Sequence, residues 1–433
     1  MTTEEIYHLF RESDYQVATD TRKLTPGSLF ICLQGSNFDA NSFAKAAIDG
    51  GCAYALASDL GVCDGLRIHY VPDTLLALQD LARHHRKQMQ AKVIGIGGSN
   101  GKTTTKELTA AVAAKKFNTI ATQANLNNHI GVPLTLLRIR PETEIAVVEL
   151  GTNHPGEIAV LCQIALPDSG IITNIGKEHL EGFGSLEGVA REESELYRFL
   201  QLNEGIAFVN ADDEWLMRMS SRLKHVVPYG LNHSGNHPRV SVDRWFPSLE
   251  LNLALEHGNI RLHSSLAGAH NLSNILAALT IGLFYGVDTA AAIEAIQDYQ
   301  PANNRSQWLQ TARNLLWLDA YNANPSSMEA ALRSFAVWNH PHKVLMLGDM
   351  YELGDAAHQE HAAIVQLAHT LGYEEIYLVG EHFHRLIEET AGDKVFLNVV
   401  QLRNYLEAHP LDGAAVLVKG SRGVAMESVA DVL

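Results

Sequence analysis

The chain has few cysteines, no long uninterrupted hydrophobic run and no excess of basic charge. Its 433 residues include only four cysteines, at positions 32, 52, 63 and 162, without metal-ligand spacing. We therefore expect reduced, mostly buried thiols in a cytoplasmic protein and no disulfide framework. No apolar segment is long enough to span a bilayer, and the acidic start MTTEEIYHLFRES lacks the basic flank and apolar run of a signal peptide. No membrane insertion is expected.

Basic residues are outnumbered by acidic ones, 33 to 49, which gives a formal net charge of −16. An acidic protein is repelled by nucleic acids and anionic membranes, so non-specific binding to either is not expected. Any phosphate ligand must therefore meet locally placed cations. Apolar residues make up 46% of the chain and charged residues 19%, which is ordinary for a globular protein, and the length predicts about three domains at ~150 residues each.

The order of expected elements divides the chain into three α/β units. Residues 1–88 form a small unit, whereas residues 89–300 and 301–433 each alternate strand and helix, which predicts mainly parallel, doubly wound sheets. Residues 240–262 alternate in the manner of antiparallel strands. The buried strands expected are 29–33 and 53–56 in the first unit, 93–96, 145–150, 170–173 and 206–209 in the second, and 315–318, 344–347, 376–379 and 415–418 in the third.

The strongest functional signal is residues 92–107, KVIGIGGSNGKTTTKE. An apolar strand runs into a glycine-rich turn and then into a helix start, a context that lets several backbone N–H groups and the positive helix end face one phosphate. The residues of this cradle are Gly98, Ser99, Asn100, Gly101, Lys102, Thr103 and Thr104, with Lys102 as a point charge and the Thr103 hydroxyl available to Mg²⁺.

The match to the strict nucleotide-loop pattern is partial, because Ile96 stands where that pattern has its first glycine. The dinucleotide pattern fits worse, since Asn100 falls where its third glycine belongs. The alternative is a glycine-rich strand-to-helix turn that binds nothing. The strand and helix on either side of Gly-Lys-Thr favour a nucleotide site.

Polar residues follow two further strands of the second unit. Glu149 ends the apolar run 145–149, as in the second metal-binding segment of nucleotide enzymes, although a carboxylate there could also simply terminate a strand or cap a helix. His179 follows strand 170–173 within TNIGKEH. A lone histidine is more often structural, but ligands of doubly wound sheets bind beyond the carboxyl ends of the strands.

Asparagines provide two more candidate groups. Asn127 and Asn128 lie in the cluster NLNN, which is either a binding loop or an Asx-rich turn. Asn271 and Asn274 are one turn apart on the helix expected at 270–285, so both face the same side.

Two charged turns lie outside the central unit. Asp20, Thr21 and Arg22 connect strands of the first unit, where the usual interpretation is a solvated pair or a turn device. The turn KGSRG near the C-terminus places Lys419, Ser421 and Arg422 before a helix, which suits a carboxylate or phosphate ligand or is a surface turn.

Ten ordered segments make the chain similar to the Mur ligase family over nearly its whole length. They are DTRKLTPGSLFICLQGSNFDAN, GGSNGKTTTKE, NLNNHIGVPLTLL, VELGTNHPGEIA, HLEGFGSLEGVA, HNLSNILAA, NNRSQ, DAYNANPSSMEAAL, LGDMYELG and VKGSRGVAMESV. The phosphate loop of the family also lacks the early glycine, so Ile96 agrees with the resemblance.

The resemblance implies an N-terminal domain for the UDP end of a substrate, a central P-loop ATPase, and a C-terminal Rossmann-like domain that helps hold ATP and an amine. ATP would phosphorylate a carboxylate to an acyl phosphate, which the amine attacks to give an amide. The segments DAYNANPSSM and LGDMYELG favour the branch that adds D-alanyl-D-alanine to a UDP-N-acetylmuramoyl tripeptide. The resemblance also implies a monomer. The alternatives are a ligase taking a single amino acid, a ligase that extends folate with glutamate, and a non-catalytic nucleotide sensor.

Family roles carry over to individual residues as expectations. Lys102 would bind the β- and γ-phosphates, and Thr103, Glu149 and His179 would serve Mg²⁺. The other expected contacts are Asn274, Arg305 and Asp319 for ATP, Asn322 for the adenine of ATP or the amine, Asp20, Thr21 and Arg22 for the UDP-sugar, and Asn127, Asn128, Lys419, Ser421 and Arg422 for the substrates.

One departure from the family concerns the helix after HLEGFGS. Many members carry there a lysine that is carboxylated by CO₂ and helps bind a second Mg²⁺, and in VAREESELY this position is Glu193. We expect the permanent carboxylate of Glu193 to replace the carbamate. The alternative is a solvated helix residue, with water bridging the gap.

If Glu193 replaces the carbamate, Glu193→Ala loses activity at low Mg²⁺, because a metal-binding carboxylate is removed. The measurement is turnover of the variant as a function of Mg²⁺ concentration. Full activity at low Mg²⁺ contradicts the hypothesis.

Overall fold

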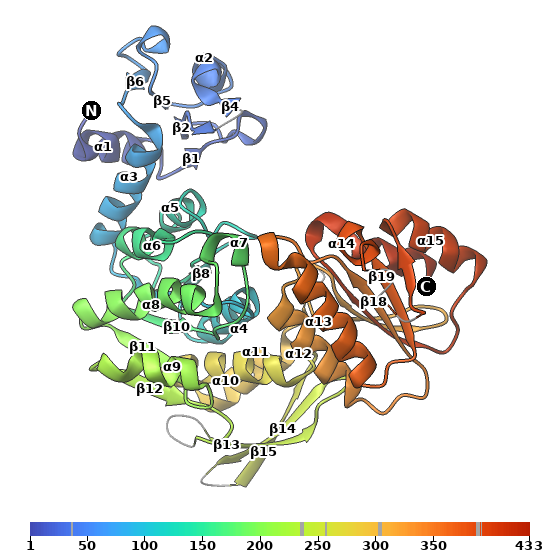
Figure 1. Cartoon of the computed structure of the whole chain (residues 1–433). Coiled ribbons are helices and arrows are strands. Elements are labelled where there is room, and N and C mark those ends of the chain that lie inside the picture. The colour runs from blue at the N-terminus through green and yellow to red at the C-terminus, as the bar shows by residue number, and fades with distance from the viewer. Residues whose placement is uncertain (36–37, 234–237, 256–257, 302–304, 387–389, 391) are drawn as a thin grey trace.

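Short runs of buried aliphatic residues form three larger sheets, each covered by helices on both faces (Figure 1). The computed structural model describes residues 1–35, 38–233, 238–255, 258–301, 305–386, 390 and 392–433. Asn303 and Asn304 of the motif NNRSQ lie outside these residues. Within the described ranges, no helix combines the length and the apolar character needed to cross a membrane.

The N-terminal domain is built on a parallel sheet with the order β1-β2-β5-β6. Its strands are β1 (Val17–Ala18), β2 (Leu29–Ile31), β5 (Tyr54–Ala57) and β6 (Ile68–Tyr70), beside a small hairpin of β3 (Gln34–Gly35) and β4 (Phe38–Asp39). Helices α1 (Thr3–Glu12) and α3 (Thr74–Gln88) cover one face, and α2 (Ala44–Asp49), preceded by a 3₁₀ turn at Ala40–Phe43, covers the other.

Helix α3 joins the N-terminal domain to the central one. The Asp73 side chain begins the helix by accepting a hydrogen bond from the Leu76 N–H. Leu81 of α3 belongs to a single hydrophobic cluster that contains Leu56 of the N-terminal sheet and Val148 of the central sheet. The hydrophobic core is therefore continuous across residue 88, where the sequence places the domain boundary.

The central domain contains a six-stranded parallel sheet with the order β12-β11-β10-β7-β9-β8. The strands are β7 (Lys92–Gly97), β8 (Thr119–Ala121), β9 (Ile145–Glu149), β10 (Ser169–Ile172), β11 (Ile206–Asn210) and β12 (Val226–Tyr229). Alternate residues of β7 face two clusters, one with α5 (Gly131–Leu136), α6 (Glu157–Ala165) and α8 (Leu186–Leu202), the other with α4 (Lys102–Ala114), α10 (Ala269–Phe284) and α11 (Thr289–Asp298). The short helices α7 (Leu180–Phe183) and α9 (Glu214–Met219) follow β10 and β11.

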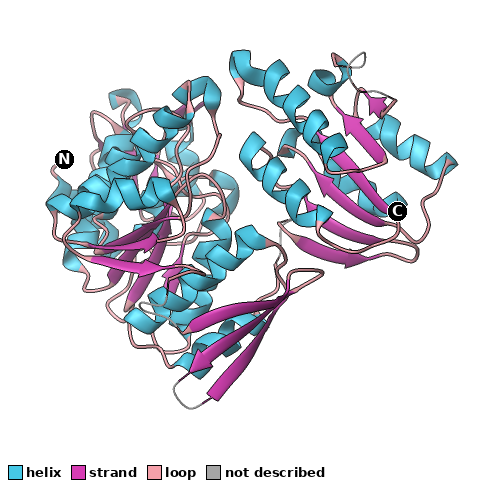
Figure 2. Cartoon of the chain, turned by 60° about the horizontal axis from the view of Figure 1, so that its bottom comes forward, coloured by secondary structure: helices cyan, strands magenta, loops and turns pink. Residues whose placement is uncertain are grey.

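A three-stranded antiparallel sheet lies between the central and C-terminal domains (Figure 2). Its strands are β13 (Arg239–Arg244), β14 (Leu249–Leu255) and β15 (Gly258–Ser264), as the alternation of 240–262 predicts. Phe246, in the turn between β13 and β14, packs against Trp317 of the C-terminal domain with ring centres 5.1 Å apart. This sheet therefore helps fix the C-terminal domain against the central one.

The C-terminal domain is a second doubly wound sheet with the order β16-β17-β21-β18-β19-β20, in which only β16 is antiparallel to its neighbour. The strands are β16 (Gln307–Gln310), β17 (Leu315–Asp319), β18 (Lys343–Gly348), β19 (Glu375–Val379), β20 (Lys394–Phe396) and β21 (Ala415–Lys419). Helices α12 (Pro325–Ala336) and α13 (Ala357–Thr370) cover one face and α15 (Val399–Ala408) the other, and α14 (Glu381–His384) follows β19.

All ten buried strands expected from the sequence are present. The strands that the sequence did not predict include β8, β12, β16 and β20. Each of them forms an edge of the central or the C-terminal six-stranded sheet. Three of these four contain no buried residue at all, so their sequences lack the continuous apolar run that marks a central strand.

Candidate active site

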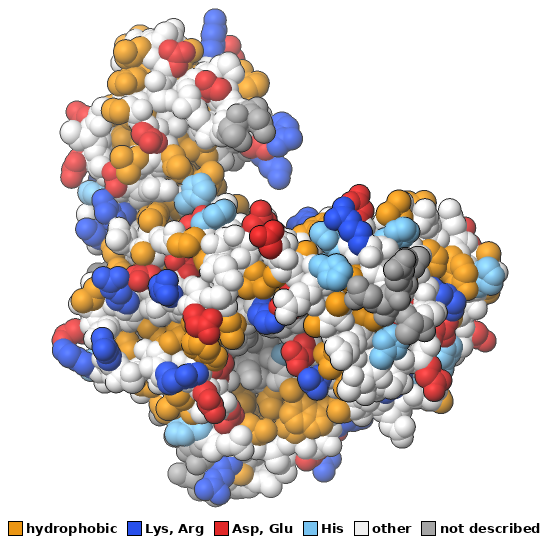
Figure 3. All heavy atoms as spheres, in the orientation of Figure 1, with side chains coloured by type: hydrophobic (Ala, Val, Ile, Leu, Met, Phe, Trp, Pro, Cys, Tyr) orange, Lys and Arg blue, Asp and Glu red, His pale blue; other side chains and the backbone are white. Residues whose placement is uncertain are grey.

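The carboxyl ends of the central and C-terminal sheets face one another across a cavity of about 950 Å³. Figure 3 shows a notch between the N-terminal and C-terminal domains. The notch lies next to the place where the central and C-terminal domains meet. Fifteen of the predicted site residues line the cavity: Ser99, Asn100, Gly101, Lys102, Thr103, Thr104, Asn127, Asn128, Glu149, His179, Asn274, Arg305, Asp319, Asn322 and Lys419. The predicted residues outside its lining are Gly98, Glu193, Asp20, Thr21, Arg22, Ser421 and Arg422.

The phosphate loop connects β7 to α4 through two glycines with positive φ, Gly98 at 110° and Gly101 at 82°. A Cβ atom on Gly98 would lie 2.3 Å from the Thr173 hydroxyl oxygen, and one on Gly101 would lie 2.6 Å from Asn274 Oδ1. Both positions therefore require glycine. No side chain caps the N-terminus of α4, so its positive end faces the cavity.

The end of β10 holds the loop in place. The Ser99 N–H donates to the Asn174 carbonyl oxygen at 2.9 Å, and the Asn100 N–H donates to Asn174 Oδ1 at 3.1 Å. The Thr173 hydroxyl donates to the Asn100 carbonyl oxygen at 2.7 Å. The cradle is thus fixed by hydrogen bonds before any ligand is considered.

Lys102 lies within a group of buried acidic residues. Its ammonium group is 3.4 Å from Glu178 Oε2 and donates to the carbonyl oxygens of Gly98 and Ser99. Burial alone would lower the pKa of Lys102, but the carboxylates of Glu178, Glu193 and Glu149 raise it. Lys102 therefore stays charged at the mouth of the cradle.

Glu149 offers a carboxylate beside the loop, and its position suits a divalent cation. Its Oε1 atom accepts hydrogen bonds from Asn127 Nδ2 at 2.9 Å and from the Thr103 hydroxyl at 3.3 Å. Its Oε2 atom is buried without a hydrogen-bond partner and lies 3.7 Å from the ammonium nitrogen of the buried Lys106. A carboxylate and a hydroxyl are the oxygen ligands that Mg²⁺ prefers, so Glu149 and Thr103 fit such an ion.

Glu193 lies behind the phosphate loop and not in the cavity lining. It is fully buried, and its Oε2 atom accepts the Gly98 N–H at 2.7 Å, while Oε1 has no hydrogen-bond partner. Burial raises the pKa of Glu193 to about 8, although Lys102 opposes this shift. The alternative of a solvated helix residue is wrong. Binding of a second metal ion by Glu193 stays a prediction.

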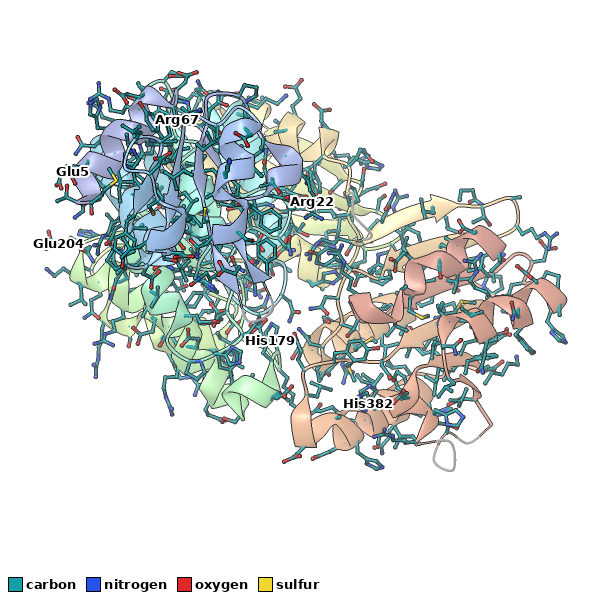
Figure 4. The ribbon with its side chains drawn as sticks, turned by 90° about the horizontal axis from the view of Figure 1, so that it is seen from above. Glu5, Arg22, Arg67, His179, Glu204 and His382 are labelled. Atoms are coloured by element: carbon teal, nitrogen blue, oxygen red, sulfur yellow. The ribbon has the colours of Figure 1, made fainter. Side chains whose placement is uncertain are left out.

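His179 lies at the junction with the C-terminal domain, as its label in Figure 4 shows. The residue has a positive φ of 44° and forms the N-cap of α7. Its Nδ1 atom is 2.6 Å from Oε2 of Glu352, which belongs to the C-terminal domain, and its Nε2 atom is 3.9 Å from Glu178 Oε2. Because Mg²⁺ binds oxygen more readily than imidazole nitrogen, the direct metal contact expected for His179 stays a prediction.

The C-terminal wall of the cavity carries the remaining charges. Asp319, at the end of β17, accepts the Lys419 ammonium group at 2.5 Å and the Ser306 N–H at 3.1 Å. Burial would raise the pKa of Asp319, but Lys419 lowers it, so the carboxylate stays ionised. The Arg305 guanidinium lies 3.6 Å from the centre of the Tyr321 ring, on the side of the domain that lines the cavity.

The turn predicted to receive the dipeptide is occupied by internal contacts. Lys419 is almost fully buried in its pair with Asp319. The Ser421 hydroxyl accepts the Tyr351 N–H at 3.0 Å, and the Arg422 guanidinium lies 5.3 Å from the centre of the Tyr321 ring. Of the three, Lys419 lines the cavity. Recognition of a dipeptide by Ser421 and Arg422 stays a prediction.

The asparagines differ in what they contact. The Asn127 amide donates a hydrogen bond to Glu149 Oε1. Asn128 Oδ1 accepts hydrogen bonds from the N–H groups of Ile130 and Gly131 and so forms the Asx turn that begins α5. Asn274 Oδ1 accepts the Thr105 hydroxyl of α4 at 3.1 Å, while the Asn274 amide donates to Asn271 Oδ1 at 3.1 Å. Asn322 is exposed on the cavity wall.

Asp20 caps the 3₁₀ turn Thr21–Lys23 of the N-terminal domain, in which Arg22, labelled in Figure 4, is exposed, whereas Asp20 and Thr21 are partly buried. Asp20 accepts three hydrogen bonds from the Arg22 side chain, at 2.8, 2.9 and 3.2 Å, and one from its backbone. These contacts lower the pKa of Asp20 to about 2. Asp20 and Arg22 thus form an ion pair within the turn, which is the usual interpretation of such a sequence. Binding of the UDP-sugar by this turn stays a prediction.

The sequence did not single out four residues that the structure brings to the site. Glu178 and Tyr321 line the cavity, Lys106 approaches Glu149, and Asn324 donates from the C-terminal domain to Asn100 Oδ1 at 2.9 Å. Glu178 stands beside His179 in the polar segment after β10, and that position was the available signal. The sequence around Asn324 does not indicate this contact, because its partner Asn100 lies in another domain.

Sequence comparison identifies the class. Residues 96–282 match the Mur ligase middle domain, and residues 304–422 match the Mur ligase, glutamate ligase domain. The chain belongs to the Mur ligase family.

Individual relatives are similar over nearly the full length. The UDP-N-acetylmuramoyl-tripeptide:D-alanyl-D-alanine ligase of Escherichia coli (strain K12) is 38% identical over 428 residues, covering 96% of this chain and 93% of that protein. The ligase of the same name from Bacillus subtilis (strain 168) is 33% identical, covering 95% and 92%. The crystal structure of MurF from Acinetobacter baumannii superposes with a TM-score of 0.86 at 33% identity, covering 96% and 93%. The three-domain fold is therefore confirmed.

We expect Gly98→Ala to weaken ATP binding about tenfold or more, because the added Cβ would displace Thr173 and distort the cradle. Isothermal titration calorimetry measures the affinity. Gly184→Ala is the matched control, since Gly184 also has a positive φ, of 72°, but has nothing within 4 Å of an added Cβ and does not line the cavity. Equal ATP affinities of the two variants would show that the close approach of Gly98 to Thr173 is unimportant.

Proposed function

We propose that this chain is an ATP-dependent amide ligase that joins D-alanyl-D-alanine to UDP-N-acetylmuramoyl tripeptide in peptidoglycan precursor synthesis. The proposal rests on the agreement between the residues that line the cavity and the similarity of the chain to ligases of this name. The cavity unites the phosphate loop, Lys102, Glu149 and His179, and the chain is 38% identical to a ligase of that name over 96% of its length.

The chemistry explains why a nucleotide site adjoins an acceptor site. A carboxylate is a poor electrophile because its negative charge repels a nucleophile. Transfer of the γ-phosphoryl group from ATP to a carboxylate oxygen gives an acyl phosphate and ADP, and the amine nitrogen then attacks the acyl carbon. The new C–N bond forms as the C–O bond to phosphate breaks, phosphate leaves, and the amine loses a proton.

The protein's contribution is to position the groups and to balance their charge. The loop N–H groups and Lys102 bind the phosphates, and the positive end of α4 points towards the same place. Arg305, stacked on Tyr321, faces the phosphates from the C-terminal domain. Asp319, Asn274 and Asn322 bind the nucleoside part of ATP.

Mg²⁺ would supply additional positive charge at the β- and γ-phosphates. We propose that Thr103 and Glu149 hold it, because they bring a hydroxyl and a carboxylate oxygen within 3.3 Å of each other beside the cradle. Glu193 and His179 complete the set expected from the family. The ammonium nitrogen of the buried Lys106 lies 3.7 Å from Glu149 Oε2.

The substrates extend from this centre in two directions. We propose that Asp20, Thr21 and Arg22 of the N-terminal domain contact the UDP-sugar, that Asn127 and Asn128 lie near the tripeptide, and that Lys419, Ser421 and Arg422 help to order the amine side. The proposed domain limits are 1–88, 89–300 and 301–433.

We also propose that the enzyme acts as a monomer in the cytoplasm. The central and C-terminal domains of one chain supply the whole cavity lining, so the site needs no second copy. All four cysteines are free thiols, three of them buried, which suits a reducing compartment.

The test is phosphate release from ATP with Mg²⁺ and UDP-N-acetylmuramoyl tripeptide, with D-alanyl-D-alanine present, omitted or replaced by single amino acids. We expect release that depends on both substrates and prefers the dipeptide. Preference for another amine would keep the ligase chemistry and change the substrate. ATP binding without turnover in every combination would contradict the proposal and favour a nucleotide sensor.

A further inference from the structure

The His179 ring is held between two carboxylates from different domains. Nδ1 lies 2.6 Å from Oε2 of Glu352, in the loop after β18, and Nε2 lies 3.9 Å from Oε2 of the buried Glu178. The His179 side chain is 17% exposed, whereas that of Glu352 is 52% exposed. Glu352 thus reaches the ring from the solvent side of the domain junction.

The contact determines which ring nitrogen carries the proton. An ionised carboxylate only accepts hydrogen bonds, so Nδ1 must be the donor to Glu352. In a neutral imidazole the other nitrogen then has a free lone pair. This nitrogen is Nε2, on the edge of the ring that faces Glu178 and not Glu352.

The backbone on both sides of the contact is specialised. His179 has φ 44° and Glu352 has φ 62°, a left-handed conformation that is uncommon for residues other than glycine. The Glu352 carbonyl oxygen accepts the Glu181 N–H at 3.2 Å, so the two segments are also joined through the main chain. The contact therefore joins two residues whose backbone conformations are uncommon.

From this geometry we propose that Glu352 is a positioning residue for the ligase reaction, which fixes the orientation and the tautomer of His179. The inference rests on the proposed function insofar as His179 acts in that reaction. Because Glu352 belongs to the C-terminal domain, His179 is correctly oriented only when that domain is docked. The contact therefore links domain docking to completion of the site.

The chain contains a matched control at the same junction. Lys177 of the central domain pairs with Glu360 of α13 at 2.5 Å, and neither residue contacts His179. Glu352→Gln and Glu360→Gln each remove one negative charge from an ion pair between the two domains. Of the two, only Glu352→Gln changes the partner of His179, and a glutamine amide can either donate to Nδ1 or accept from it.

The first measurement is the ¹⁵N spectrum of histidine-labelled protein at pH 8, with the His179 signals assigned by their loss in His179→Asn. It reports the tautomer without requiring turnover. We expect a protonated Nδ1 and an unprotonated Nε2 in the wild type and in Glu360→Gln, and a mixture of tautomers in Glu352→Gln. A protonated Nε2 in the wild type would overturn the proposal.

The second measurement separates kcat from KM. We expect Glu352→Gln to lower kcat about 10- to 100-fold, as for other residues that orient a functional histidine, with little change in KM for ATP. Glu360→Gln should retain a kcat close to that of the wild type. Equal losses of kcat in the two variants, with no change of tautomer, would show that Glu352 serves only domain docking and would overturn the proposal.

The two measurements also separate this inference from the proposed function. A wild-type protein with the expected tautomer but without ligase turnover would refute the proposed function, while the orientation of His179 by Glu352 would stand. An active wild-type enzyme whose tautomer and kcat are unchanged by Glu352→Gln would refute the inference alone. Since Glu352 is half exposed, thermal unfolding is expected to show a folded variant.

Discussion

The close approach of β7 and β10 at their carboxyl ends is the constraint on which the rest of the site depends. Gly98 passes so near Thr173 that even one added carbon atom would clash, and this contact sets the shape of the phosphate cradle. The same strand end supplies Asn174, which holds Ser99 and Asn100, and leads to Glu178 and His179. The anion-binding loop and its acidic partners are therefore parts of one rigid unit.

The buried lysines near the cavity contrast with the negative charge of the chain as a whole. Although the net charge of the chain is −16, buried lysines lie next to carboxylates at and beside the cavity. Lys102 faces Glu178, Lys106 lies between Glu107 and Glu149, and Lys419 pairs with Asp319. The carboxylates of Glu178, Glu193 and Glu149 raise the pKa of Lys102, and the pairs set the positions of the three lysines before the substrate arrives.

The catalytic centre is complete only where two domains meet. Asn324 donates to Asn100, Glu352 accepts from His179, and Phe246 packs on Trp317, all across the junction of the central and C-terminal domains. Interfaces of this kind allow relative motion of domains, and closure that assembles an active site is common in enzymes with mobile domains.

Sequence patterns predicted the parts of the fold that are locally determined. Ten buried strands, the phosphate loop and the acidic end of β9 all carry their own signal, because burial on both faces requires a continuous apolar run and phosphate binding requires glycine. The half-exposed edge strands β8, β16 and β20 carry no such run. The sequence led us to expect Glu193 in place of a metal-binding carbamate but did not indicate its burial, because only tertiary packing places it under Gly98.

The residues that join domains were the least predictable. Glu352 and Asn324 stand in segments that the sequence did mark, LGDMYELG and DAYNANPSSM, but their partners are distant in the chain. The same holds for Asp319, whose pairing with Lys419 depends on the adjacency of β17 and β21. Predicting such pairs requires the order of strands in the sheet, which local sequence does not give.

The central claim is that this site converts a carboxylate into an acyl phosphate before the amide bond forms. The most direct test uses UDP-N-acetylmuramoyl tripeptide labelled with ¹⁸O in its terminal carboxylate, with ATP, Mg²⁺ and D-alanyl-D-alanine, and measures the isotope in the released phosphate by mass spectrometry. The account predicts that one carboxylate oxygen appears in each phosphate released. Amide formation with unlabelled phosphate would contradict it.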